Sequence, residues 1–139
     1  PVLFQPVKIG KSYYLDGGVA DSVPYQRAFE KGCDKVIVLL TRERDYIKTA
    51  EKSGKAAAAL YRRYPKLVER LNRRPKDYNQ CMKELYEAEK EGKVFVIAPK
   101  DTFGTGRTES DPEKLKKLYA EGYEQAKEEM QALRRYLDA

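Results

Sequence analysis

The stretch SYYLDGGVADSVPYQRAFEKGCDKVIVLLT, residues 12–41, decides the fold that the sequence predicts. It contains a short aromatic strand, a tight turn DGG at residues 16–18, and a helix whose first turn Pro24 suits. The run Lys35–Thr41 is continuous and rich in β-branched residues, which is typical of a strand covered on both faces. Strand, turn, helix and buried strand in this order indicate an α/β fold with a parallel component.

Outside this stretch, the sequence predicts more helix than strand. Val2–Ile9 is typical of an extended edge segment, since Pro6 cannot donate a hydrogen bond to a central ladder. Helical sequence begins at Ala56 and runs on past an interruption at Pro65. We expect Pro75 to open a further helix.

The C-terminal part has clear helix signals around one short strand. Gly92 ends the preceding helix, and Val94–Ile97 is predicted to be a short buried strand. Asp111 and Pro112 mark the start of a last helix of about 25 residues, since Asp is a favoured N-cap and Pro suits the first turn. We expect its apolar stripe to pack into the core; the stripe comprises Leu115, Tyr119, Tyr123, Ala126, Met130, Leu133 and Leu137.

Composition excludes several classes of site. The 139 residues include no histidine, which removes Ser-His-Asp and Cys-His catalysis and histidine-ligated metals. Two cysteines, Cys33 and Cys81, are too few for a thiolate cage or a disulfide scaffold, so we expect ordinary buried thiols in a reducing, cytoplasmic compartment. No metal or cofactor is expected, and the longest apolar run, Val36–Leu40, is too short to span a membrane.

Positive charge is concentrated in the first half of the chain. Residues 1–70 contain 14 basic and 8 acidic side chains, whereas residues 71–139 contain 14 of each. The excess forms a run in predicted helical sequence, which is either a solvated face or a surface for lipid phosphates or nucleic acid. Its candidate anion-contacting residues are Arg62, Arg63, Arg70, Arg73 and Arg74.

Asp16 is the main candidate for a catalytic residue. Asp-Gly after a strand is a common hairpin signal, but the residues from Val19 to Pro24 lead into a helix instead of a returning strand. A carboxylate at the end of a strand occupies the place where α/β proteins put reactive groups, and Gly17 and Gly18 allow close approach of a ligand or loop. From the residues alone, a turn-forming role and a catalytic role both stay open.

The string YLDGGVADSVP, residues 14–24, with KVIV at 35–38, resembles the C-terminal catalytic segment of patatin-like phospholipases, bacterial branch. Further stretches at 91–97 and 107–123 extend the resemblance over nearly the whole chain. It implies the C-terminal part of a three-layer α/β/α catalytic domain at residues 1–45. A mostly helical extension with one added strand near 94–97 would then occupy residues 46–139.

The resemblance also implies a serine–aspartate dyad that hydrolyses acyl lipids, phospholipids or related esters, with Asp16 as the base. The family's nucleophile lies in a G-x-S-x-G elbow, and none of the four serines of this chain has that context. We therefore expect an upstream part of the same protein to supply the serine and the oxyanion loop. The 139 residues alone are expected to be inactive.

Two other functions compete with this one. The basic run could make the chain a non-enzymatic module for nucleic acid or anionic membrane, with nucleic acid the less favoured partner. A catalytically inactive scaffold is the other alternative. Under the enzymatic interpretation, the protein is cytoplasmic, with a peripheral place at an anionic membrane.

Overall fold

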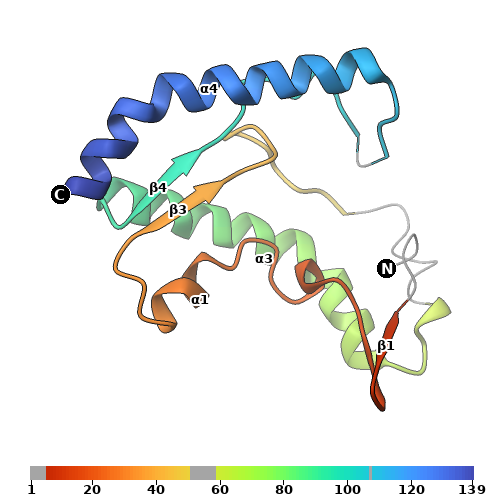
Figure 1. Cartoon of the computed structure of the whole chain (residues 1–139). Helices are drawn as coiled ribbons and strands as arrows, with labels where there is room; N and C mark the ends of the chain where they lie inside the picture. Colours follow the sequence, from red (N-terminus) through yellow and green to blue (C-terminus); the bar gives the residue numbers. More distant parts are fainter. Residues whose placement is uncertain (1–5, 51–58, 107) are drawn as a thin grey trace. The chain divides into compact units, whose positions relative to one another are not determined.

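A computed structural model describes residues 6–50, 59–106 and 108–139. Over these residues the chain is a small mixed α/β protein with three α-helices and two small sheets (Figure 1). It divides into two compact units, Pro1–Pro24 with Ile47–Glu84 and Tyr25–Tyr46 with Leu85–Ala139. The domain boundary expected after residue 45 stays a prediction.

The first unit contains a hairpin, a short 3₁₀ turn and most of a long helix. Strands β1 (Val7–Ile9) and β2 (Ser12–Tyr14) pair antiparallel, with Val7 opposite Tyr14. Gly10 makes the connecting turn with φ +61°, a conformation that side chains rarely adopt. Both strands were predicted, although residues 2–5 of the expected extended segment lie outside the described residues.

Helix α3 (Pro65–Lys90) corrects the predicted helix boundaries. Pro65 begins this helix instead of interrupting one, and Pro75 lies inside it instead of opening a second helix. A proline in the first turn costs no hydrogen bond, whereas an interior proline forfeits one and is tolerated only where the surrounding turns hold the helix. Ala59 and Leu60 are helical, and the predicted start at Ala56 lies outside the described residues.

The second unit is built around two parallel strands. Helix α1 (Tyr25–Glu30) ends at Gly32, whose φ of +87° suits glycine, and leads into β3 (Val36–Leu39). Strand β4 (Val94–Ile97) pairs with β3 in parallel, with Val36 opposite Val94. The parallel component of the α/β prediction is therefore confirmed.

Only one face of this sheet is fully buried. Val36, Val38, Val94 and Val96 are buried on that face, and Leu85 is the most deeply buried side chain of the same unit. On the other face of β3, Ile37 is 42% exposed and Leu39 is 70% exposed. The expectation that β3 is covered on both faces is therefore wrong within the described residues.

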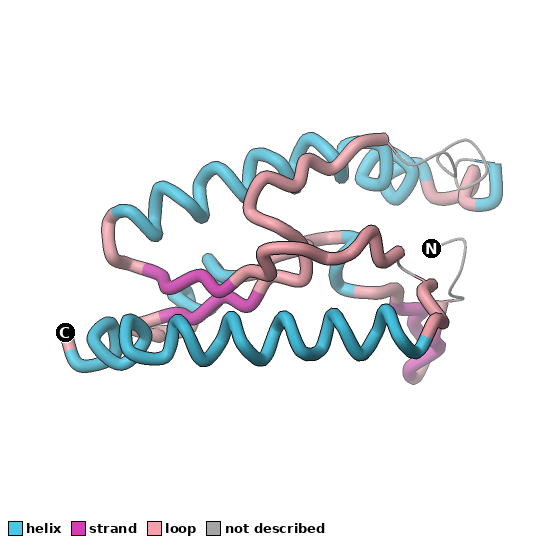
Figure 2. Tube along the Cα trace, turned by 90° about the horizontal axis from the view of Figure 1, so that it is seen from above, coloured by secondary structure: helices cyan, strands magenta, loops and turns pink. Residues whose placement is uncertain are grey.

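Helix α4 (Pro112–Asp138) lies beside β4 (Figures 1 and 2). Asp111 caps it as predicted, since its carboxylate accepts a hydrogen bond from the amide of Glu113 at 2.9 Å. The expected packing of its apolar stripe is wrong, because Tyr119 is 76% exposed and Met130 is 42% exposed. The helix turns Gln125 inward instead, and Tyr136 contacts the ring of Phe95 on the sheet.

None of the described helices has a stretch both long and apolar enough to cross a bilayer.

Candidate active site

The turn that carries Asp16 follows β2 directly and forms a short 3₁₀ helix, η1 (Gly17–Val19). Asp16 is its N-cap: Oδ1 accepts a hydrogen bond from the amide of Gly18 at 2.8 Å. The carbonyl of Asp16 accepts from the amide of Val19 at 3.0 Å. The Asp-Gly-Gly segment is therefore a capped helical turn, and the hairpin alternative is excluded.

The two glycines of the motif have different surroundings. Neither has a positive φ, so the turn does not demand glycine for its backbone conformation. A Cβ added to Gly18 would lie 3.3 Å from Asp16 Oδ1 and 3.6 Å from a guanidinium nitrogen of Arg74. A Cβ added to Gly17 would meet nothing within 4 Å. The close approach of the Asp16 carboxylate thus explains why residue 18 is a glycine, but it does not explain the glycine at position 17.

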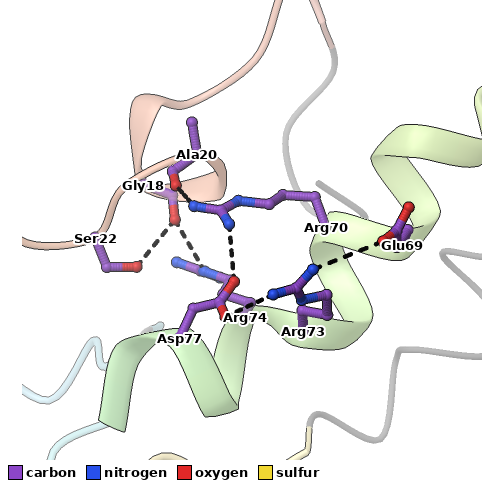
Figure 3. Close-up of polar contacts among 8 residues, drawn as sticks. All are labelled: Gly18, Ala20, Ser22, Glu69, Arg70, Arg73, Arg74 and Asp77. Atoms are coloured by element: carbon purple, nitrogen blue, oxygen red, sulfur yellow. Dashed lines mark hydrogen bonds and ion pairs between the residues drawn. The ribbon is translucent and has the colours of Figure 1, made fainter. Parts of the chain in front are cut away.

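Two arginines of α3 hold the carbonyls of this turn (Figure 3). Arg74 Nε donates to the carbonyl oxygen of Gly18 at 3.0 Å, and Arg70 donates to that of Ala20. The two lie four residues apart, which places them on the same face of the helix. Ser22 Oγ donates to the same Gly18 carbonyl at 3.0 Å, so this oxygen has two donors.

Acidic side chains of α3 pair with Arg70 and with the neighbouring Arg73. Arg70 Nη1 lies 2.8 Å from Asp77 Oδ2, and Arg73 lies 3.9 Å from Asp77 Oδ1 and 3.8 Å from Glu69 (Figure 3). Three of the five arginines predicted to contact anions therefore have partners within the first unit. Arg62 and Arg63 are exposed in the turn that precedes α3. Whether any of the five contacts an anionic surface stays a prediction.

Asp16 itself is exposed. Among the described residues, the amide of Gly18 is the hydrogen-bond donor found for its carboxylate, through Oδ1, and no donor to Oδ2 is found. The second aspartate of the turn, Asp21, is held in a similar way, since its Oδ1 accepts from the amide of Val23 at 3.1 Å. The turn thus presents two exposed carboxylates, each held by an amide at Oδ1, and Asp16 is the one that caps η1.

The cysteines differ from the expectation that both are buried. Cys33 is exposed, and Cys81 is half-buried beside the turn, with its sulfur 3.7 Å from the carbonyl oxygen of Val23. Burial, followed by the nearby negative charges of Asp21 and Glu84, raises the pKa of Cys81 to about 11. Cys81 is therefore a thiol at neutral pH and a poor nucleophile. The described residues contain no group of three or more acidic or cysteine side chains able to hold a metal ion.

Sequence reasoning did not foresee the roles of Arg70 and Arg74. The signal was present as a pair of arginines at helical spacing, but a basic run of this kind predicts a solvated face equally well. Their partners are backbone carbonyls, at Ala20 and Gly18, 50 and 56 residues earlier. No pattern in the side chains identifies such an acceptor.

The fold and the turn define a small mixed α/β protein with a capped Asp-Gly-Gly turn. Comparison with protein families places it further: residues 64–138 match the model "Domain of unknown function (DUF6363)", and the chain belongs to that family. No curated protein matches the chain, and no solved structure matches it.

The comparison corrects the resemblance to patatin-like phospholipases, since no patatin or phospholipase family model matches. The α/β class holds, but a patatin-like three-layer domain is not found. The motif that suggested it, at residues 14–24, lies outside the matched region. A short D-G-G string after a strand is a weak indicator, because any capped turn from a strand into a helical segment favours the same residues.

Proposed function

We propose that Asp16 acts as a general base in the hydrolysis of acyl esters, toward a serine hydroxyl supplied by a segment outside this chain. The observation that carries the proposal is an exposed carboxylate held at one oxygen, on a turn that two arginines fix. A base needs both features. It must reach the hydroxyl proton through an accessible oxygen, and it must stay in one orientation while it does so.

The chemistry assigned to Asp16 is a proton transfer. Its free oxygen would take the proton of the serine hydroxyl as the serine oxygen attacks the ester carbonyl carbon. The proton would then pass to the departing alcohol as the acyl–oxygen bond breaks and an acyl-enzyme forms. Water, deprotonated by the same carboxylate, would then attack the acyl carbon; the bond from that carbon to the serine oxygen breaks, the proton returns to the serine oxygen, and the acid leaves. No histidine is needed in this sequence of steps, which agrees with the composition of the chain.

The arginine contacts support a positioned turn. Arg70 and Arg74 direct charged donors to two neutral carbonyls of an exposed turn, where water could otherwise solvate those oxygens. A hydrogen bond from a charged group contributes about 1.5 to 3 kcal/mol. Both contacts fix the turn that Asp16 caps, and a fixed turn keeps the Asp16 carboxylate in one orientation.

The serines of the chain support an external nucleophile. Ser22 Oγ donates to the Gly18 carbonyl, and Ser12 lies within the exposed strand β2. Ser110 precedes the cap of α4, and Ser53 lies outside the described residues. None of the three described serines follows a strand in a glycine-flanked elbow that would expose a reactive hydroxyl. The proposal therefore assigns no esterase activity to the 139 residues alone.

The experiment compares two aspartates of the same turn. The chain is produced together with whatever coding sequence precedes Pro1, and hydrolysis of a short-chain acyl ester is measured for the Asp16→Asn and Asp21→Asn variants. Asparagine caps a helix as well as aspartate does, so both variants should retain the thermal stability of the parent. We expect Asp16→Asn to lower the rate by about 10²- to 10⁴-fold, the usual contribution of general base catalysis.

Two results would contradict the proposal. A near-parent rate for Asp16→Asn would reduce Asp16 to a capping residue. Hydrolysis by the 139 residues alone would exclude an external nucleophile. Asp21→Asn is the matched control, because Asp21 also accepts an amide hydrogen bond two residues ahead but is not assigned the base.

The alternative of a basic binding module has weaker support. Arg70 and Arg74 already donate to the turn, and Arg73 has two acidic neighbours. A surface that binds phosphates needs cations whose donors are free to reach them. In the basic run, Arg62 and Arg63 satisfy this requirement best, since both are exposed.

A further inference from the structure

The residues just before α3 form a tight turn that carries two arginines. The amide of Tyr64 donates to the carbonyl of Tyr61 at 2.8 Å, which places Arg62 and Arg63 at the two central positions of a four-residue turn. Tyr61 is buried and anchors the turn, whereas both arginines are exposed. Lys66, in the first turn of α3, is exposed as well. Residues 60–66 thus form a basic turn.

The three cations of the basic turn have no acidic neighbour to pair with. No hydrogen bond or ion pair of their side chains is found among residues 6–50, 59–106 and 108–139. Residues 59–68 contain these cations and no acidic residue. Farther along α3 the pattern differs, since Arg70 and Arg73 both pair with Asp77. Within the described residues, the basic turn therefore keeps its charged donors for another molecule.

The position of these charges does not stabilise the helix that follows. The amino end of a helix carries a positive partial charge, so acidic residues are favoured there and cations are disfavoured. Helix α4 follows this rule, with Asp111 as its cap and Glu113 in its first turn. Helix α3 has no acidic residue in its first turn and contains Lys66 there instead. A negatively charged partner would compensate both the helix end and the cations.

Two large apolar side chains accompany the cations. Leu60 is 64% exposed and Tyr64 is 62% exposed. Such residues beside arginine and lysine are typical of segments that lie in a membrane interface, where apolar groups enter the headgroup region and cations meet lipid phosphates. Nucleic acid would use the cations and could stack on Tyr64, but it gives no reason for an exposed Leu60. The mixture of side chains therefore favours a lipid surface.

We propose that the basic turn docks the protein on the surface of an anionic lipid bilayer. Arg62, Arg63 and Lys66 bind the lipid headgroups, while Leu60 and Tyr64 enter the interface. Each cation near such a surface strengthens binding by about fivefold, so the three together contribute about 100-fold. The inference goes beyond the proposed function and does not depend on the role of Asp16.

Vesicle binding of the whole chain tests this docking. Co-sedimentation is measured with vesicles of phosphatidylcholine alone and with vesicles of phosphatidylcholine and phosphatidylserine in equal amounts. We expect binding to the mixed vesicles that weakens as salt is added, since salt screens the contacts, and much weaker binding to the neutral vesicles. Arg62→Gln combined with Arg63→Gln should lower the affinity by about 30-fold, because two cations are lost. Leu60→Ser should lower it by about tenfold, because serine has little apolar surface to bury.

A pair of lysines on α4 provides the matched control. Lys116→Gln combined with Lys117→Gln removes the same charge from two adjacent exposed residues near the start of a helix. This pair lies outside the basic turn, so its loss should change the affinity by less than about twofold. Thermal unfolding of each variant verifies that it is folded.

Three results would overturn the proposal. The first is an absence of binding to the mixed vesicles, and the second is an equal loss of affinity for the two glutamine pairs. The third is binding to a single-stranded oligonucleotide that is tighter than vesicle binding and unchanged by Leu60→Ser. That result would assign the basic turn to nucleic acid.

Discussion

Arg74 Nε donates to the carbonyl oxygen of Gly18 at 3.0 Å, which ties the middle of α3 to a turn 56 residues earlier. The same carbonyl accepts from Ser22 Oγ at 3.0 Å, and Arg70 holds the carbonyl of Ala20 (Figure 3). Three side-chain donors therefore hold two carbonyls of this turn, and two of the donors come from α3. Substitution of Arg74 tests how much the turn depends on α3.

Replacing Arg74 with methionine should loosen the turn and lower stability by about 0.5 to 1.5 kcal/mol, the usual net contribution of one hydrogen bond, since Ser22 Oγ still donates to the Gly18 carbonyl. Hydrogen exchange of the Gly18 and Val19 amides should accelerate, because both bond to Asp16 in this turn. Arg73→Met is the matched control: its side chain is 62% exposed, and its ion pairs of 3.8 and 3.9 Å contribute little. Equal effects of the two variants would contradict a specific role for Arg74.

The two glycines of the turn should respond differently to alanine. Gly18→Ala places a Cβ 3.3 Å from Asp16 Oδ1, so the carboxylate must shift by a few tenths of an ångström. Gly17→Ala meets nothing within 4 Å and needs no change of φ, so it should be neutral or stabilising by up to about 1 kcal/mol. Thermal unfolding separates the two. If the proposed function holds, Gly18→Ala should also reduce ester hydrolysis more than Gly17→Ala does.

The two thiols should react at very different rates. Cys33 is exposed, whereas burial raises the pKa of Cys81 to about 11 and keeps its thiolate fraction small at pH 8. With a thiol-reactive chromogenic disulfide, we expect one fast and one slow reaction per chain. Cys33→Ser should abolish the fast phase. The slow phase should accelerate as the pH rises toward 11, and a fast Cys81 at neutral pH would contradict this geometry.

The carboxylate of Glu43, in the second unit, should make the free energy of unfolding depend on pH in the acidic range. Glu43 Oε1 accepts hydrogen bonds from the Thr102 hydroxyl and, at 2.7 Å, from the Thr102 amide. The hydroxyl contact is the main reason that the pKa of Glu43 lies below its usual 4.5. Since the folded state favours the charged form, this stabilisation is present above pH 4.5 and is lost as the pH falls through the lower folded pKa.

Thermal unfolding of the Glu43→Gln variant between about pH 3 and 6 tests this dependence. The parent should lose stability on acidification more steeply than the variant does. Glu124→Gln, an exposed residue on α4 paired with Lys127, is the control and should follow the parent. Parallel curves for the parent and Glu43→Gln would show that the Glu43–Thr102 contact does not contribute.

Much of the local structure could be predicted from the sequence. Asp111 and Pro112 mark the start of α4, and Gly92, with φ +72°, ends α3 before the buried strand Val94–Ile97. These signals act within one or two turns of the chain: a cap satisfies free amides, and glycine adopts a conformation that other residues avoid. Local chemistry of this kind is present in the sequence itself.

The tertiary structure decided what those elements contact. The apolar stripe of α4 predicts a buried face, yet Tyr119 is 76% exposed and Gln125 is buried in its place. The run Lys35–Thr41 predicts cover on both faces, yet Ile37 and Leu39 are open on one. Hydrophobic periodicity identifies the side of an element that prefers burial, but it does not identify the neighbour that buries it.

In the candidate site, too, some features could be predicted from the sequence and others depend on tertiary contacts. The sequence by itself determined that a tight turn follows a strand at Asp16, because the aspartate and the two glycines that indicate the turn lie within three residues. Only the tertiary structure decided that Arg70 and Arg74 hold this turn, since their acceptors are backbone carbonyls that every residue possesses. Contacts between a side chain and distant backbone leave no pattern in the sequence, because the backbone is the same at every position.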